Sequence, residues 1–144
     1  MRIMAVDYGD VRTGIAVSDE SAKLAGEAWV LTERDAFTAA RTIAGEAVSR
    51  GVVMIVVGHP INMDGSTGPR AEKSERLAEA VRGLCDVEVV LWDERMTTVS
   101  ANRILTETGR FGKKRKKTVD AVAASLILDS YLSFMALQSG TGQK

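Results

Sequence analysis

The stretch that first constrains the fold is residues 3–17, IMAVDYGDVRTGIAV. Two short apolar runs, residues 3–6 and 13–17, flank a turn that contains Gly9. Apolar, β-branched runs separated by a short loop with glycine are typical of a β-hairpin. We therefore expect the chain to begin with two antiparallel strands, and Asp7 either ends the first strand or opens the turn.

The rest of the sequence alternates between apolar runs and segments of helical periodicity. Three more strands are expected, at residues 29–31, 52–57 and 87–92. Four helices are expected, at residues 35–50, 69–84, 97–109 and 119–137. This order predicts an α/β or α+β fold with one mixed β-sheet flanked by helices. We expect a single domain at residues 1–138 and a frayed tail at residues 139–144.

The composition is that of a globular protein, with 45% hydrophobic and 26% charged residues in a chain of 144. A single cysteine, Cys85, excludes a disulfide framework. The sequence starts without a signal-peptide pattern, and no uninterrupted apolar run approaches the roughly 18 residues of a membrane span. We therefore expect a soluble cytoplasmic protein that does not enter a membrane.

The charge is unevenly distributed, although the formal net charge is zero. Six basic residues and no acidic residue lie in RFGKKRKK, namely Arg110, Lys113, Lys114, Arg115, Lys116 and Lys117. Such a run can solubilise a surface loop, or it can bind a phosphate backbone and release counterions. Because this run ends three residues before the acidic residue Asp120, which is discussed below, we favour a nucleic-acid contact.

Acidic residues occur at the ends of two expected strands. Asp7 follows the first strand, and Asp93 and Glu94 follow the strand at residues 87–92. Asp is depleted in strands, and a buried carboxylate is costly without a partner. If the chain is still extended at Asp93 and Glu94, the two side chains point to opposite faces, so at most one of them faces a given site.

A third acidic residue, Asp120, lies in the first turn of the last expected helix. The helix dipole favours an acid there, which is sufficient by itself to explain the residue. Helical spacing nevertheless places Asp120 on the same face as Ala124 and Ile127, which must turn toward the sheet. Several carboxylates at one edge of a sheet would repel one another without a cation.

Clustered carboxylates are the ligands that Mg²⁺ prefers. Two such ions, ~4 Å apart, can activate water and stabilise the leaving oxygen in phosphodiester hydrolysis. With a basic segment close by to hold a phosphate backbone, the sequence predicts a metal-dependent nuclease.

Four stretches of the chain together resemble the YqgF/RuvX family, which has an RNase H-like fold. In chain order they are AVDYGDVRTGIAVSD, VVGHPINMDGSTGPRAEKS, VVLWDERMTT and KKRKKTVDAVAASLILDSYL. The resemblance covers essentially the whole chain. It implies that Asp7, Glu94 and Asp120 are catalytic and hold Mg²⁺ or Mn²⁺, as two ions, with Asp93 the less favoured alternative to Glu94.

The resemblance also implies a substrate. The family is associated with maturation of the 5′ end of 16S ribosomal RNA, so pre-rRNA, and with it the ribosomal particle, is the first expected partner. Branched DNA is the second, since the family was first viewed as a Holliday junction resolvase. One departure is His59, in Gly58-His59-Pro60 where the family commonly has Gly-Leu-Pro; we expect this side chain to lie in solvent and assign it no catalytic role.

Two further arginines are candidate nucleic-acid contacts. Arg95 follows the acidic pair and can either bind phosphate bidentately or neutralise a carboxylate. Arg70 stands in the first turn of an expected helix, where the dipole disfavours a cation. With only seven aromatic residues, base stacking has little support from the sequence.

Three other functions compete with RNA processing. A Holliday junction resolvase would need a symmetric dimer to make matched incisions, and the sequence identifies no interface. A sugar-kinase-like or actin-like ATPase is suggested by Asp7-x-Gly9, but those enzymes close two lobes around the nucleotide and this chain supplies one. A non-catalytic RNA-binding or protein-binding factor of ribosome assembly would need only the basic segment.

Overall fold

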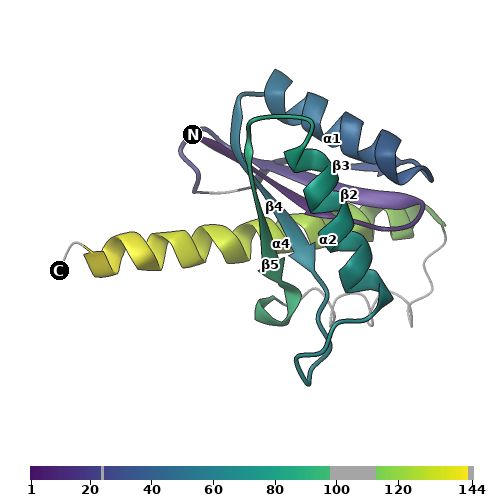
Figure 1. Ribbon diagram of the computed structural model, residues 1–144. Helices are drawn as coiled ribbons and strands as arrows, with labels where there is room; N and C mark the ends of the chain where they lie inside the picture. The colour runs from purple at the N-terminus through teal and green to yellow at the C-terminus, as the bar shows by residue number, and fades with distance from the viewer. Residues whose placement is uncertain (24, 98–112, 143–144) are drawn as a thin grey trace.

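The computed structural model describes residues 1–23, 25–97 and 113–142, with side chains up to residue 97 and over residues 121–138 (Figure 1). Its centre is a five-stranded sheet in the order β3-β2-β1-β4-β5. The strands are β1 (Arg2–Asp7), β2 (Arg12–Ser18), β3 (Ala25–Thr32), β4 (Val52–His59) and β5 (Glu88–Asp93). β1, β2 and β3 are antiparallel neighbours, whereas β4 pairs in parallel with both β1 and β5. The predicted mixed sheet is therefore confirmed.

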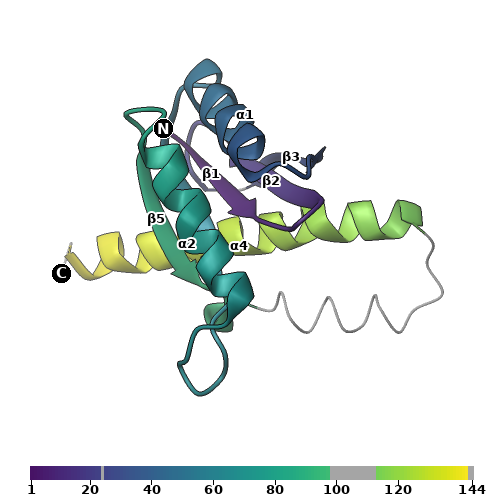
Figure 2. The same ribbon diagram turned by 45° about the vertical axis from the view of Figure 1, so that its right-hand side comes forward.

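Helices cover both faces of the sheet (Figures 1 and 2). The helices α1 (Ala36–Ser49) and α2 (Pro69–Arg82) pack on one face, and the long helix α4 (Lys113–Gly142) crosses the other. Alternation along β1 sends Met4 and Val6 toward α1 and α2, and Ile3 and Ala5 toward α4. This two-sided burial explains why the central strands are continuous apolar runs.

The N-terminal hairpin forms as the sequence predicts. Asp7 pairs with Gly14 of β2, so it belongs to the first strand and does not open the turn. At Gly9 a Cβ atom would collide with the carbonyl group of Arg12, so the tight return of the chain requires glycine there.

The helices predicted at residues 35–50 and 69–84 are confirmed as α1 and α2, and their ends have clear local causes. The Asp35 carboxylate caps α1 by accepting hydrogen bonds from the backbone N–H of Thr38 (2.9 Å) and from its hydroxyl (2.7 Å), which lower the pKa of Asp35. Gly51 follows α1 with a φ of 69°, a conformation that favours glycine. Pro69 occupies the first turn of α2.

The last helix differs from the prediction at both ends. It begins at Lys113 rather than Val119, and it continues to Gly142 beyond the expected end near Leu137. Lys and Arg are good helix formers, and no glycine or proline interrupts residues 113–139. The segment from Lys113 to Lys117 is therefore helical, not a loop. Of the helix predicted at residues 97–109, all but Thr97 lies outside the described residues; Thr97 ends the short 3₁₀ helix η1 (Glu94–Met96).

The expectation that no segment could span a membrane needs correction. Residues Ala121–Gln138 of α4 have the length and mean hydropathy, 1.4, of a membrane-spanning helix. In this fold, however, five side chains of that segment are buried against the sheet: Ala123, Ala124, Ile127, Leu128 and Leu132. We therefore interpret the segment as a core helix of the domain.

The burial difference along β4 gives a direct test of the fold. Ile55 is completely buried, whereas Val53, two residues earlier, is 49% exposed. We expect Ile55→Ala to lower the free energy of unfolding by about 2–5 kcal/mol, because it leaves a cavity between the sheet and α2. The control Val53→Ala should cost less than about 1 kcal/mol. Urea unfolding measures both, and equal losses would contradict the assigned sheet register.

Candidate active site

The candidate site lies where β1, β4 and β5 end at one edge of the sheet. Val6 pairs with Val57, so Asp7 and Gly58 follow side by side on neighbouring strands, and Gly58 pairs with Trp92 of β5. Neighbouring strands are about 4.8 Å apart. Asp7 continues the alternation of Ile3 and Ala5, so its side chain faces α4, and it is only 3% exposed.

Glu94 lies on the same face, at the start of η1 just after β5, and is 5% exposed. A Cβ atom on Gly58 would lie 2.9 Å from Glu94 Oε2 and 2.7 Å from Cδ1 of Ile127 in α4. The Glu94 carboxylate therefore lies over Gly58, between the sheet and α4. The missing side chain of Gly58 leaves the space for the Glu94 carboxylate, which therefore lies at the same edge and on the same face of the sheet as Asp7.

The third predicted acid, Asp120, lies in α4 seven residues before Ile127, which is about 10 Å along the helix axis. It precedes Ala124, which packs on the sheet, by four residues. Its side chain lies outside the described part of the structure. Among the side chains that are described, no three His, Cys, Asp or Glu residues form a group that could hold a metal ion.

Asp93 has a different environment from Glu94. Its carboxylate accepts hydrogen bonds from Arg95 Nη2 at 2.7 Å and Nε at 2.9 Å, and from the Arg95 backbone N–H at 2.8 Å. These bonds hold the pKa of Asp93 below its ordinary value. Trp92 packs on the α4 side of the sheet, so alternation directs Asp93 to the opposite side. The geometry thus brings Glu94, not Asp93, together with Asp7.

Arg95 neutralises a carboxylate in this structure, which was one of its two predicted roles. Its guanidinium pairs with Asp93 and also donates to the carbonyl oxygen of Met63 at 3.5 Å. This second contact connects η1 to the loop between β4 and α2. That loop is held by its own hydrogen bonds, with Asn62 N–H donating to the Ser66 carbonyl at 2.9 Å and Gly65 N–H donating to the Asn62 carbonyl at 2.8 Å.

The expected solvent position of His59 is wrong. β4 extends two residues beyond the predicted end, which places the His59 side chain on the α2 side, where it is 14% exposed. Its Nε2 lies 2.7 Å from Glu75 Oε2 of α2. His59 therefore links the end of β4 to α2.

The other predicted nucleic-acid contacts are distributed over two elements. Arg70 is exposed in the first turn of α2. Lys113, Lys114, Arg115, Lys116 and Lys117 form the first turns of α4, with their side chains outside the description, and Arg110 lies outside the described residues.

Gly58 was not among the residues predicted for the site, although its missing side chain makes room for Glu94. The signal was available: a glycine directly follows the β-branched run VVMIVV, and an isolated glycine at such a place often marks the close approach of another group.

The fold is that of the RNase H-like nucleases of the RuvC type. Thermus thermophilus RuvC in complex with a Holliday junction substrate superimposes with a TM-score of 0.57 at 15% identity, over 93% of this chain and 96% of that chain. The fowlpox virus Holliday junction resolvase gives a TM-score of 0.57 at 14% identity, over 92% and 99% of the two chains. At this identity the likeness establishes the fold.

Sequence relatives identify the family. Residues 1–134 match RuvX, described as "Holliday junction resolvase". A protein of Halothermothrix orenii is 43% identical over 93% of this chain and 96% of its own length, and one of Bacillus cytotoxicus is 43% identical over 92% and 98%. Both carry the name "Putative pre-16S rRNA nuclease". The chain therefore belongs to the RuvX family of nucleases, as its motifs predicted.

The role of Gly58 can be tested by adding one methyl group. In Gly58→Ala the new Cβ would press on Glu94 and Ile127, and both contacted atoms are side-chain ends that can shift. We expect the free energy of unfolding to fall by about 1–3 kcal/mol.

The matched control is Gly45→Ala in α1, where a Cβ atom would meet nothing within 4 Å. It should stabilise the protein by about 0.5–1 kcal/mol, because alanine favours a helix. If Gly58→Ala were as stable as Gly45→Ala, the close packing of Glu94 over Gly58 would be incorrect.

Proposed function

We propose that the protein is a metal-dependent phosphodiester hydrolase that processes the 5′ end of pre-16S rRNA, with Asp7, Glu94 and Asp120 as its catalytic residues. The observation that carries this proposal is the pair of buried carboxylates, Asp7 and Glu94, on one face at one edge of the sheet. Burial of two like charges is unfavourable unless a cation compensates them.

The donor set fits a hard divalent cation. Carboxylate oxygens are the protein ligands that Mg²⁺ and Mn²⁺ prefer, and Mg²⁺ keeps several waters, so a few carboxylates are sufficient. Asp7, Glu94 and, from its position in α4, Asp120 would hold two such ions. When bound, the ions activate water and stabilise the leaving oxygen of an in-line displacement.

The basic segment of α4 would position the substrate. Lys113 to Lys117 form the first turns of the helix, where the macrodipole disfavours cations. A phosphate backbone offsets this repulsion and releases counterions. Since Asp120 follows three residues later, a strand held by these residues would pass close to the carboxylates. Arg70 is exposed in the first turn of α2, just after the loop between β4 and α2, and would add a second phosphate contact.

Pre-rRNA is the proposed substrate because relatives that are about 40% identical over most of the chain are named "Putative pre-16S rRNA nuclease". The protein would then act in the cytoplasm, during ribosome biogenesis, on RNA or on an assembling ribosomal particle. Branched DNA is the second candidate, from the family description. Cleavage of a DNA junction has a physical requirement that cleavage of RNA lacks, because matched incisions in a junction need two symmetry-related active sites.

The test offers a 5′-extended 16S leader RNA and a four-way DNA junction side by side, with Mg²⁺ or Mn²⁺. We expect the wild-type protein to cut the RNA, and Asp7→Asn and Glu94→Gln each to lower the rate at least about a hundredfold, more than the loss of an outer-shell partner causes. Asp93→Asn is the matched control and should retain cleavage, because Asp93 pairs with Arg95 on the other side of the sheet.

The alternatives give different results. Junction cleavage that depends on Asp7 would favour the resolvase. RNA binding with cellular function intact in Asp7→Asn would favour the non-catalytic assembly factor. Cleavage that survives both substitutions would show that another site, or a contaminating nuclease, is responsible.

A further inference from the structure

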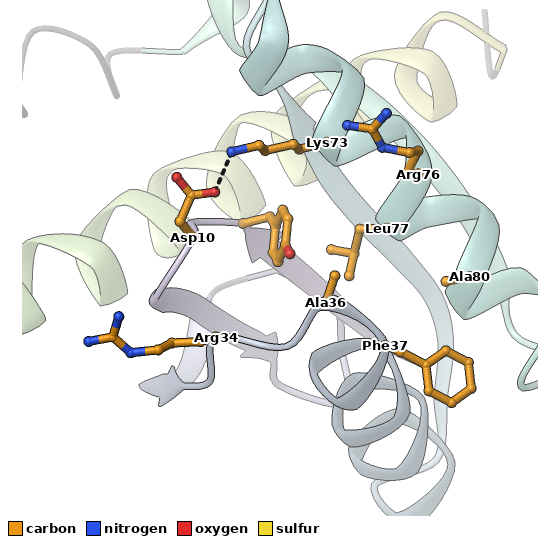
Figure 3. Close-up of a pocket in the computed structure, with 9 residues that line it drawn as sticks. Asp10, Arg34, Ala36, Phe37, Lys73, Arg76, Leu77 and Ala80 are labelled. Carbon is orange, nitrogen blue, oxygen red and sulfur yellow. Dashed lines mark hydrogen bonds and ion pairs between the residues drawn. The ribbon is translucent and has the colours of Figure 1, made fainter.

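A second surface feature lies at the same end of the sheet but on its opposite face. It is a cavity of about 500 Å³ between the β1–β2 turn, the start of α1 and one side of α2 (Figure 3). Its lining includes Tyr8, Asp10, Arg34, Phe37, Lys73 and Arg76. Neither the acidic site nor the basic segment of α4 includes any of them.

The lining combines aromatic and aliphatic surface with positive charge. Tyr8 is half-buried against the core, and Phe37 is 57% exposed, so both present ring surface to the cavity. In Figure 3, Lys73 and Arg76 project from α2 on one side of the cavity, and Phe37 lies on α1 on the other. Flat apolar surface beside guanidinium groups is suited to a planar ring that carries an anionic group.

The charges of the cavity are mostly available to a ligand. Lys73 Nζ pairs with Asp10 Oδ1 at 2.7 Å, an exposed contact that water screens. Neither Arg34 nor Arg76 has a carboxylate partner among the described residues. Three cations and one carboxylate leave two net positive charges at the cavity.

The cavity is also connected to the candidate active site. Tyr8 directly follows Asp7 in the chain, and the two side chains lie on opposite faces of the same strand end. Arg70, Lys73 and Arg76, spaced three residues apart on α2, lead from the loop beside the site toward the cavity. Lys73, by hydrogen bond and charge, and to a lesser extent the charge of Arg70, lower the pKa of Asp10.

We propose that this cavity is a subsite for one nucleotide of the single-stranded RNA that continues past the cleaved bond. The base stacks on Tyr8 and Phe37, and its phosphate binds Arg76. The volume suits a nucleotide-sized group. An unpaired base exposes its ring face to aromatic side chains, whereas a base within a duplex does not. The assignment rests on the proposed nuclease function, since it treats the occupant as part of that substrate.

The test measures binding of a fluorescent single-stranded RNA from the 16S leader by anisotropy, in EDTA so that no metal-dependent cleavage occurs. Phe37→Ala should weaken binding about tenfold with an unchanged salt dependence, because it removes stacking. Arg76→Ala should weaken binding about fivefold and reduce the slope of log K against log[salt] by about 0.7, as expected for one lost phosphate contact. The control Arg41→Ala, an exposed arginine of α1 that does not line the cavity, should bind within twofold of wild type.

Other results would overturn the subsite. These are wild-type affinity in Phe37→Ala and Arg76→Ala, an equal loss in Arg41→Ala, or no RNA binding by the wild-type protein. Calorimetric titration with AMP provides a second arm: tight AMP binding that Arg76→Ala abolishes, with RNA binding unchanged, would assign the cavity to a free nucleotide.

The nuclease proposal is tested separately by cleavage in Asp7→Asn. Normal RNA binding in the cavity variants, with cleavage lost in Asp7→Asn, would reject the subsite alone. Weakened binding in Phe37→Ala and Arg76→Ala, with no cleavage by any form, would support the subsite and reject the nuclease.

Discussion

The burial of Asp7 and Glu94 on one face of the sheet edge is the constraint on which the rest of the account depends. The two carboxylates are 3% and 5% exposed, and Gly58, on the strand between them, leaves room for that of Glu94. The parallel pairing of β1, β4 and β5 fixes this arrangement, because it ends three strands at one edge. α4 closes the site from the other side through Ile127. A cation held by Asp7 and Glu94 would compensate the cost of burying them.

The hairpin, the sheet and helices α1 and α2 could be predicted because local signals agreed with tertiary packing. Asp35, Gly51 and Pro69 mark helix ends, and VVMIVV marks a strand buried on both faces. The start of α4 could not be predicted in the same way. Helix propensity favoured Lys113 to Lys117 as a helix, whereas the density of like charge favoured a solvated loop.

At the candidate site, the acidic residues could be predicted from the sequence, but the groups that contact their side chains could not. Alternation indicated that Asp93 and Glu94 point to opposite faces, yet only the fold shows that Arg95 holds Asp93 and that Glu94 lies over Gly58. His59 was misplaced because the strand continues to it and α2 supplies Glu75, a contact between residues 16 positions apart. The meeting of Tyr8 and Phe37 in one cavity likewise depends on tertiary structure, and a count of aromatic residues does not reveal it.

The central claim, that Asp7 and Glu94 hold a divalent cation, is tested most directly by the free energy of unfolding at increasing Mn²⁺ concentration. A ligand that binds only the folded state stabilises it, by about 2.7 kcal/mol at a hundredfold excess over the dissociation constant. We expect this rise for the wild-type protein and for Asp93→Asn, and its loss in Asp7→Asn and Glu94→Gln. An equal rise in Asp7→Asn and wild type would contradict it.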